Sequence, residues 1–482
     1  MADWEVVIGL EIHAELLTKS KVFCGCSTQF GGTPNSQVCP VCLGLPGALP
    51  VLNRKAVELA IKAGLALQCN INQYSQFDRK HYFYPDLPKA YQISQNELPV
   101  CSDGKVELQM GETVREIGIQ RVHLEEEAGK SLHAGDSIMS AAYSLLDYNR
   151  CGIALIEIVT EPDIRSPEEA RLFLEKLKTL LEYTEVSDCK MEEGSLRCDA
   201  NISLRPIGAS SFGVKSEIKN LNSFRAVQRA LEFEVERQKA VLAAGESVLP
   251  ETRHWDEAQG MTFSMRSKEK AADYRYFPEP NLYPLEIEPG WVESIKAELP
   301  ELPDARRDRF VAAYGLPIYD ADVLTTSRDL ADYFETCMQE VKDAKLVSNW
   351  VMGEVLRWLK AHGLEAAESP VRPGELAGLL RLIQENVVSN IVAKEVLAEM
   401  FASGKPAALI VEEKGWKQVS DSGSLEAMIE EVLADNPGPV ADVKGGKTKA
   451  IGFLVGQVMK ASKGTANPQK VNEMLRDKLQ VK

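Results

Sequence analysis

The segment from residue 6 to residue 16 ends in a run in which apolar and polar side chains alternate. Side chains two apart on a β-strand share a face, so one face of this strand is apolar and the other carries Glu11, His13 and Glu15. Two carboxylates around an imidazole suit a divalent metal ion. The same alternation is typical of a strand with one face in solvent, so this segment alone predicts a one-sided sheet and leaves both interpretations of its polar face open.

Two further segments present carboxylates in a similar way. Residues 195–205 alternate again, and their polar face carries Ser195, Arg197, Asp199, Asn201 and Ser203. Residues 123–130 contain the acidic run Glu125, Glu126 and Glu127 beside His123. Hard cations such as magnesium prefer oxygen ligands, and such an ion beside Arg and Lys is what phosphate chemistry needs. The recurrence therefore favours a metal site assembled from several segments.

The chain is long enough for several domains. At 482 residues we expect two to four of them. Up to about residue 289 the sequence is rich in strand patterns, with a helix predicted after the cap Ser166, where Glu169 would complete a capping box, and another after Ser223. Beyond residues 284–303 the patterns are helical, and a turn cluster at 435–439 precedes two short terminal helices.

Composition excludes several classes of protein. No apolar run approaches the roughly 18 residues of a membrane span. Asp3, Trp4 and Glu5 stand where a secretory signal would be basic, so we expect a cytoplasmic protein with no membrane partner. The net charge of −16 argues against broad nucleic-acid binding. Residues 441–482 nevertheless hold nine Lys or Arg against three acidic residues, which fits either a local RNA-binding patch or a solvated tail.

Four of the ten cysteines form two close pairs. The pairs are Cys24 with Cys26 and Cys39 with Cys42. Thiolates at this spacing are typical of a closed tetrahedral zinc site, whose role is structural because no coordination position stays open. The alternative is a loop with four reduced thiols.

Residues 77–92 interleave aromatic and basic side chains between prolines. Such a loop can stack a base and hold phosphates, although a packed surface loop is also compatible with it. Lys219, Asn220, Arg266, Arg275 and Tyr276 are weaker candidates of the same kind. Gly446-Lys447-Thr448 approaches a phosphate-binding loop, but Ala441 stands where its first glycine belongs. No dinucleotide-binding fingerprint or serine-hydrolase elbow is present, so any ATP would be bound by another fold.

Taken together, these segments resemble the GatB family, which comprises the B subunits of aspartyl/glutamyl-tRNA(Asn/Gln) amidotransferases. The resemblance spans essentially the whole chain, although some members lack the four cysteines. The matching segments are residues 8–13, 77–92, 123–130, 156–163, 191–206, 217–224 and 273–280.

The resemblance implies an α+β fold with three parts. Residues 1–292 would form a kinase-like cradle on an antiparallel sheet, with a zinc knuckle at 24–42. Residues 293–408 would form an all-helical domain, and residues 409–482 a small helical tail that binds tRNA through Lys444, Lys447, Lys449, Lys460 and Lys463.

The implied reaction amidates Glu or Asp that is already esterified to tRNA(Gln) or tRNA(Asn). ATP would phosphorylate the side-chain carboxylate, and ammonia would displace the phosphate. The ammonia would come from glutamine hydrolysis on a separate amidase chain, the A subunit, which a small C subunit ties to this chain. Whether Glu-tRNA, Asp-tRNA or both are substrates stays open.

This mechanism predicts roles for the polar segments, because two anions must be brought together. We expect Glu11, His13, Glu125 and Glu126 to bind magnesium, with Asp199 or Glu193 completing the site. Lys80, Arg197 and Lys219 would neutralise phosphate charge. The remaining nucleotide-binding candidates are Tyr82, Tyr84, Lys89, Tyr91, Ser195 and Asn220, of which the tyrosines would shape the pocket for the terminal adenosine.

Two alternative functions remain at this point. A nonenzymatic tRNA-binding scaffold would keep the basic tail but would not need the acidic segments. A free-standing ATP-dependent ligase acting on a small metabolite would need neither the basic tail nor the aromatic loop.

Overall fold

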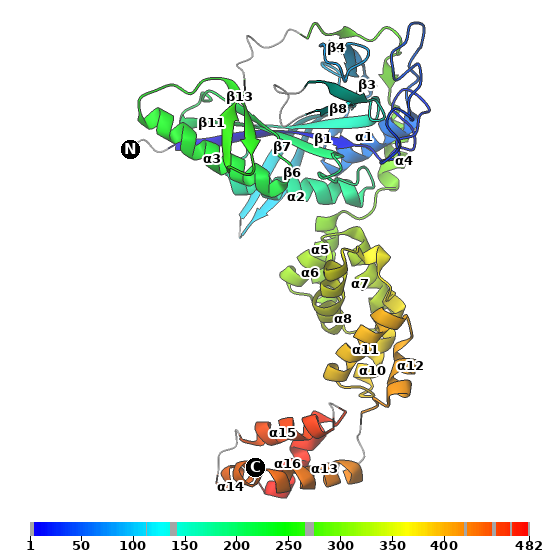
Figure 1. The fold of residues 1–482 in the computed structure, drawn as a ribbon, viewed down its shortest axis with the longest axis vertical. Helices are drawn as coiled ribbons and strands as arrows, with labels where there is room; N and C mark the ends of the chain where they lie inside the picture. Colours follow the sequence, from blue (N-terminus) through cyan, green and yellow to red (C-terminus); the bar gives the residue numbers. More distant parts are fainter. Residues whose placement is uncertain are drawn as a thin grey trace. The chain divides into compact units, whose positions relative to one another are not determined.

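The structure is a computed structural model that describes residues 4–111, 113–134, 142–265, 274–418, 422–445, 450–462 and 465–480. It divides into two compact units, Met1–Leu302 and Pro303–Lys482. The first unit combines a large sheet with helices, and the described part of the second contains helices without strands (Figure 1). The predicted mixed α and β architecture with a helical C-terminal part is thereby confirmed.

A nine-stranded sheet organises the first unit. Its strand order is β14-β13-β12-β11-β1-β10-β7-β6-β2. The strands are β1 (Trp4–Glu15), β2 (Asn70–Ile71), β6 (Cys101–Met110), β7 (Thr113–Glu126), β10 (Ala154–Thr160), β11 (Leu196–Pro206), β12 (Ser216–Lys219), β13 (Glu251–Asp256) and β14 (Met261–Ser264).

The sheet departs in one place from the antiparallel arrangement that the sequence led us to expect. Strands β12 and β13 pair in parallel, while the other neighbours in this sheet pair antiparallel. Helix α3 (Phe224–Ala243) connects these two strands. A parallel pair needs a crossover connection of this kind, whereas an antiparallel pair can be joined by a tight turn.

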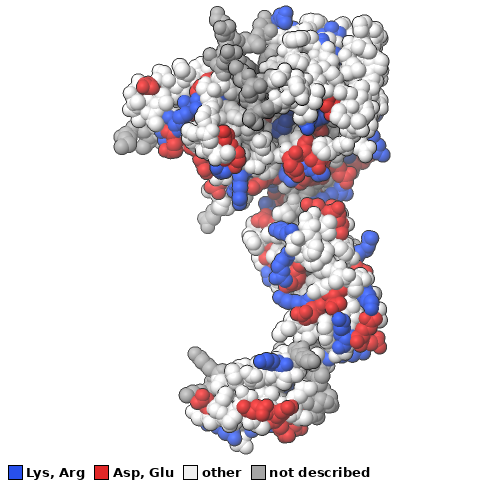
Figure 2. Space-filling model, viewed as in Figure 1, with Lys and Arg blue, Asp and Glu red and all other residues white. Residues whose placement is uncertain are grey.

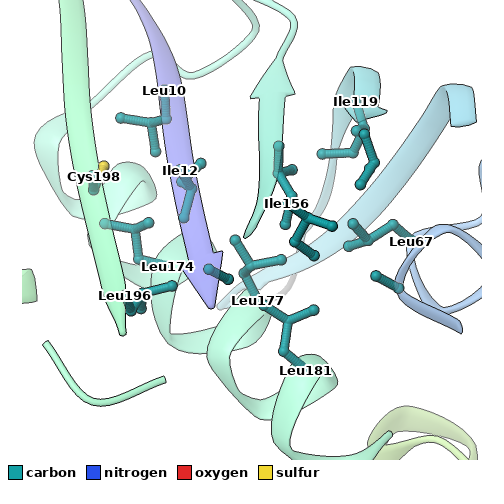
Figure 3. Close-up of a cluster of buried hydrophobic side chains, with 14 of the residues drawn as sticks. Leu10, Ile12, Leu67, Ile119, Ile156, Leu174, Leu177, Leu181, Leu196 and Cys198 are labelled. Carbon is teal, nitrogen blue, oxygen red and sulfur yellow. The ribbon is translucent and has the colours of Figure 1, made fainter. Parts of the chain in front are cut away.

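The apolar face of β1 lies in the core, as its alternation predicts. Leu10 and Ile12 are buried with Ile156 of β10 and Leu196 of β11, and they pack against Leu174 of helix α2 (Figure 3). Helices α1 (Arg54–Ala66), α2 (Pro167–Tyr183) and α3 all contribute buried side chains to the same cluster. Burial of each large aliphatic side chain contributes about 1.5–3 kcal/mol, so this packing determines which side of β1 stays polar.

Helix α2 begins at the predicted cap Ser166, and α3 follows Ser223 as expected. Ser166 Oγ accepts a hydrogen bond from the Glu169 amide at 3.1 Å, and Ser223 Oγ accepts one from the Ala226 amide at 3.0 Å. The capping box is different from the expected one, because Glu169 Oε2 accepts from the amide of Arg165 at 2.6 Å. The Glu169 carboxylate thus binds the backbone amide of the residue before the cap instead of the amide of the cap itself.

In the described part of the first unit, three small sheets and helix α4 (Pro289–Ala297) accompany the large sheet. The sheet β15-β4-β5 brings both ends of the aromatic loop together, and β5 lies against β7 of the large sheet. The first small sheet consists of β15 (Phe277–Pro278), β4 (Asp78–His81) and β5 (Tyr91–Ser94). The second pairs β16 (Leu285–Glu286) with β3 (Tyr74–Ser75), and the third pairs β8 (Lys130–His133) with β9 (Ser144–Asp147).

The described residues of the second unit form two separate hydrophobic clusters, one within residues 310–411 and one within residues 425–479. The helices of the first are α5 (Pro303–Tyr314), α6 (Ile318–Leu324), α7 (Arg328–Glu340), α8 (Ala344–Trp350), a π-helical turn (Val351–Val355), α9 (Leu356–His362), a 3-10 turn (Ala366–Glu368), α10 (Pro373–Gln384), α11 (Asn390–Ser403) and α12 (Ala407–Lys414). Those of the second are α13 (Ser422–Asp435), α14 (Pro437–Lys444), α15 (Ala450–Ala461) and α16 (Pro468–Leu479). Among the described residues, no helix combines the length and the apolar character needed to cross a bilayer.

Candidate active site on the polar face of the sheet

Three neighbouring strands bring acidic and imidazole side chains together. The register pairs His13 of β1 with Glu157 of β10, and Glu157 with His123 of β7. Paired residues in an antiparallel ladder point to the same face, and Glu125 lies two residues beyond His123 on that face. The cluster is therefore a direct consequence of strand order and register.

The distances within this cluster are short. His13 Nε2 lies 3.3 Å from Glu157 Oε2 and 3.5 Å from Glu125 Oε1. His123 Nε2 lies 3.5 Å from Glu157 Oε2 and 3.7 Å from Glu125 Oε2. The Nδ1 atom of His123 is buried without a hydrogen-bond partner among the described residues.

Charge and burial oppose each other here. Burial lowers the pKa of His13, but Glu157 and Glu125 outweigh it, so the pKa is raised above its ordinary value. Burial raises the pKa of Glu125, but hydrogen bonding from His123 and the charge of His13 outweigh it, so the pKa is lowered. The site thus favours ionised carboxylates that need positive charge nearby.

The ligand atoms of His13, Glu125 and Glu157 lie within 4.8 Å of one another. Adjacent ligands on an octahedral ion with bonds near 2.1 Å are about 3 Å apart, so distances of 3.3 and 3.5 Å fit such an ion after small side-chain adjustments. Two carboxylates and one imidazole suit Mg²⁺ or Mn²⁺. Glu157 was not among the residues predicted from the sequence, although its single charge within the apolar strand β10 was a signal for it.

Glu11 and Asp199 lie on the same polar face as His13. The register pairs Glu11 with Asp199, and His13 with Arg197. Glu11 Oε1 accepts a hydrogen bond from Asn201 at 3.1 Å, and Asp199 Oδ2 accepts one from Lys219 at 2.5 Å. Both carboxylates therefore have their own partners and lie outside the three-residue cluster.

Glu126 and Glu125 are neighbours in β7, so their side chains point to opposite faces of the sheet. The side chain of Glu126 forms an ion pair with Lys89 and accepts a hydrogen bond from the Ile93 amide at 2.8 Å. Lys89, Tyr91 and Glu126 line a cavity of about 200 Å³ together with Cys24 and Cys42. The structure thus brings Glu126 to the cysteine loop and keeps it apart from the other expected magnesium ligands.

Lys80 and two tyrosines form a second part of the site. Lys80 Nζ lies 4.9 Å from the ring centroid of Tyr274 and 5.8 Å from that of Tyr82, and the two rings lie 6.1 Å apart. Burial lowers the pKa of Lys80, but the charges of Glu125 and Glu157 outweigh it and raise the pKa. The sequence did not single out Tyr274, which lies beside Lys80 together with Tyr82.

The other two tyrosines of the loop lie elsewhere. Tyr84 is 64% exposed, and its ring lies edge-to-face with that of Tyr82 at 6.5 Å between centroids. The guanidinium of Arg79 lies 4.2 Å from the ring centroid of Tyr91. Lys89 Nζ lies 5.3 Å from the same centroid, and Tyr91 lines the cavity beside the cysteine loop.

Several other predicted residues maintain local structure. Ser195 Oγ donates to Asp188 at 2.5 Å and accepts from the Lys190 amide at 2.9 Å, while Glu193 pairs with Lys190. Arg197 forms an ion pair with Glu127 on the polar face.

Asn220 adopts a positive φ of 67° and donates a hydrogen bond to the Trp255 carbonyl at 2.9 Å. Arg275 is exposed and Tyr276 packs against Tyr274. Arg266 lies outside the described residues.

The four predicted zinc ligands converge. The sulfur atoms of Cys24, Cys26, Cys39 and Cys42 lie within 4.8 Å of one another, and those of Cys39 and Cys42 are 3.9 Å apart. Sulfur atoms on a tetrahedral zinc ion with bonds near 2.3 Å are about 3.8 Å apart, so the geometry fits this metal. Hydrogen bonding from the Cys24 thiol lowers the pKa of Cys42 to about 4 and thereby favours a thiolate.

The basic tail is described only in part. Lys444 ends helix α14 and Lys460 lies in the last turn of α15, and both are exposed. Lys447, Lys449 and Lys463 lie outside the described residues. The face of the C-terminal helices shown in Figure 2 carries basic and acidic side chains together.

Comparison with known proteins covers nearly the whole chain. Residues 6–293 match the family of the GatB/GatE catalytic domain, and residues 332–479 match the GatB domain. The chain is 57% identical over 479 residues to the B subunit of the aspartyl/glutamyl-tRNA(Asn/Gln) amidotransferase of Carboxydothermus hydrogenoformans, with 99% of each chain covered. The proteins of the same name from Caldanaerobacter subterraneus and Moorella thermoacetica are 58% identical over 99% of this chain and 99% and 100% of their own.

Proposed function

This chain belongs to the GatB family, and we propose that it amidates Glu or Asp esterified to tRNA(Gln) or tRNA(Asn). The relatives that bear this function in their names match along their whole length. Their designation as B subunits supports a complex, in which an amidase chain, the A subunit, supplies ammonia and a small C subunit holds the two together. We expect this complex in the cytoplasm.

The reaction requires activation because a carboxylate is a poor electrophile. A side-chain carboxylate oxygen attacks the γ-phosphorus of ATP, and the bond to ADP breaks. Ammonia then attacks the carbonyl carbon of the acyl phosphate, the carbon–oxygen bond to phosphate breaks, and the nitrogen loses a proton to leave the amide. Both anions of the first step must be held together, so catalysis depends on positive charge at the site.

The cluster of His13, Glu125 and Glu157 supports the first step. When bound there, Mg²⁺ would supply the charge that offsets repulsion between the substrate carboxylate and the γ-phosphoryl group. Lys80 would place an ammonium against the same anions from the side of the aromatic loop. Glu126 does not belong to this proposal, because its carboxylate is used by Lys89 on the other face.

Glu11, Asp199 and Lys219 provide a second polar group beside the cluster. Lys219 is half-buried between Asp199 and Glu217, whose charges raise its pKa against the effect of burial. It would bind a phosphate oxygen when Asp199 turns toward a second ion. Arg197, next to His13 in the register, would neutralise charge on the leaving phosphate.

The aromatic loop and the terminal helices would position the tRNA. Tyr82 and Tyr274 form an edge-to-face pair beside Lys80, which suits the stacking of the terminal adenosine. Lys444 and Lys460 would contact the tRNA body. We also infer that residues 1–292 are a kinase-like cradle with a zinc knuckle, that 293–408 are the helical domain, and that 409–482 are the tRNA-binding tail.

The observation that carries the proposal is the convergence of His13, Glu125 and Glu157 on one face of the sheet. The test combines the chain and its partner subunits with ATP, Mg²⁺, glutamine and misacylated tRNA, and traps the acyl phosphate with hydroxylamine. We expect ATP-dependent amide and, with hydroxylamine, a hydroxamate on the tRNA. Binding of tRNA without amide formation would favour the scaffold, and amidation of a free acid without tRNA would favour the metabolite ligase.

A further inference from the structure

Lys21 is a lysine with no exposed surface. It lies just before the first cysteine pair, and its amide donates a hydrogen bond to the carbonyl of Cys26 at 3.0 Å. Lysine is almost never fully buried unless its charge is paired, because removing an ammonium from water costs several kcal/mol. The partner of this ammonium therefore has to be identified.

The partner is a cysteine sulfur. Lys21 Nζ lies 3.6 Å from Cys42 Sγ and 3.3 Å from the carbonyl oxygen of Tyr148. Within the described ranges, no carboxylate lies within ion-pair distance of this nitrogen. Lys89, a second buried lysine of the same region, shows the usual solution, since it pairs with Glu126.

An anionic sulfur centre would balance this charge, since Cys42 Sγ is the acceptor nearest to the ammonium that can carry a negative charge. Four neutral thiols would leave the ammonium buried with weak acceptors and no counter-charge. Four thiolates around a zinc ion carry more negative charge than the ion can neutralise, so the centre is a net anion. An ammonium that donates a hydrogen bond to one sulfur atom of this centre offsets part of the negative charge. It also makes that sulfur less nucleophilic.

We propose that Lys21 is the counter-ion of a four-thiolate zinc centre and that it holds the metal by donating to Cys42 Sγ. This inference rests on the proposed zinc centre. Lys21 contacts no metal and acts through the sulfur, as do the groups that hydrogen-bond to metal ligands in other proteins, whose loss typically costs 10–100-fold in metal affinity.

The test uses the full-length chain and two variants, Lys21→Met and Lys21→Gln. Metal analysis first establishes the zinc content, and transfer of zinc to a chromophoric chelator then gives the rate of release. We expect one zinc per chain in the parent and release at least about tenfold faster in Lys21→Met. Lys21→Gln keeps N–H donors without the charge, so it should also release zinc faster than the parent.

The matched control is Lys62→Met on α1. The Lys62 side chain is 14% exposed and its Nζ lies 4.0 Å from Glu58, so the variant removes a part-buried ammonium that has a carboxylate partner. Its zinc release should equal that of the parent. Parent-like release in both folded Lys21 variants would overturn the inference, whereas a parent chain without zinc would overturn the zinc centre itself.

A variant that fails to fold still gives a result. Cys42→His replaces a thiolate with a neutral ligand that zinc accepts, which removes one negative charge from the centre. If Lys21 acts through charge, the double variant Lys21→Met/Cys42→His should regain soluble, zinc-containing protein. Suppose that Cys42→His alone folds and binds zinc but the double variant does not. This result would count against the counter-ion role.

Discussion

Each of the two units contains a cluster of charged side chains, but the clusters differ in how their charges are matched. In the helical unit, Arg306 Nη2 lies 2.6 Å from Asp332 and 2.5 Å from Glu335, and Arg309 and Tyr314 bind the other oxygen of Glu335 at 2.7 and 3.0 Å. In the sheet unit, Glu125 and Glu157 face two imidazoles at 3.3–3.7 Å. Planar guanidinium groups satisfy carboxylates with short, directed bonds, and the imidazoles here do not.

We infer that this difference distinguishes a structural cluster from the proposed binding site. In the helical cluster the carboxylates and guanidinium groups pair with one another, so we expect it to contribute stability without a ligand. The sheet cluster concentrates negative charge that a compact cation and the Lys80 ammonium would complete. The predictions below test this contrast.

The largest expected effect follows from Glu125→Gln in the reconstituted complex. The variant removes a carboxylate from the centre of the cluster, so amidation should fall at least about a hundredfold, while glutamine hydrolysis by the amidase partner persists. The control is Glu116→Gln on the same strand, because Glu116 is exposed and pairs with Lys105 at the surface. Amidation near the parent rate in Glu125→Gln would refute the proposed role of this cluster.

Glu157→Gln should change the dependence on metal. It retains the size of the side chain but weakens one ligand, so half-maximal amidation should need at least about tenfold more Mg²⁺. Titration of Mg²⁺ at saturating ATP and tRNA measures the effect. An unchanged Mg²⁺ requirement would mean that Glu157 only orients His13 and His123.

Glu335→Gln should affect stability instead of chemistry. It leaves the buried guanidinium of Arg306 with a weaker partner, so helices α5 and α7 should lose about 2 kcal/mol, measured by hydrogen exchange of their peptides in the full chain. Glu340→Gln on the same helix is the control, because its pair with Arg381 is exposed and such pairs contribute little. Equal exchange in both variants would remove the distinction between the two clusters.

The same carboxylate makes the helical unit sensitive to acid. Burial raises the pKa of Glu335, but hydrogen bonds from Arg309, Arg306 and Tyr314 outweigh it and lower the pKa from 4.5 to about 2. A lowered folded-state pKa means that the stabilisation is complete above pH 4.5 and is lost as the pH falls from 4.5 toward 2. Hydrogen exchange of α5 and α7 should therefore accelerate over this range in the parent, and less so in Glu335→Gln.

Much of the fold is visible locally in the sequence, because alternation and caps act over a few residues. Examples are the alternation of β1, the cap Ser166 and the start of a helix after Ser223, and all three are confirmed. Glu157 was missed because its importance depends on the register between β10 and its neighbours, which joins residues more than thirty positions apart. Glu126 was grouped with Glu125 because both belong to a run of three acidic residues. Such a run shows no alternation of polar and apolar side chains, although neighbouring strand residues point to opposite faces.

Lys21 illustrates a further limit. Nothing near Lys21 in the sequence indicates that it is buried, because its burial depends on Cys42 and Tyr148, which come from distant segments. Charge pairing is a property of the folded chain, so the sequence predicts the ligands of a metal more readily than the groups that balance them.

The smallest expected effect concerns the C-terminal helices and extends the contrast between paired and unpaired charges. Within the described residues, Lys444 and Lys460 form no ion pair, whereas Lys478 lies 3.0 Å from Glu426 and also pairs with Glu430. The double variant Lys444→Ala/Lys460→Ala should therefore weaken tRNA binding a few-fold and lower the salt slope of the binding constant by about 1–2. Lys478→Ala should leave both quantities unchanged, because its charge is already neutralised. An effect of Lys478→Ala about half as large as that of the double variant would mean that net charge, and not the availability of an unpaired ammonium, determines how this bundle binds tRNA.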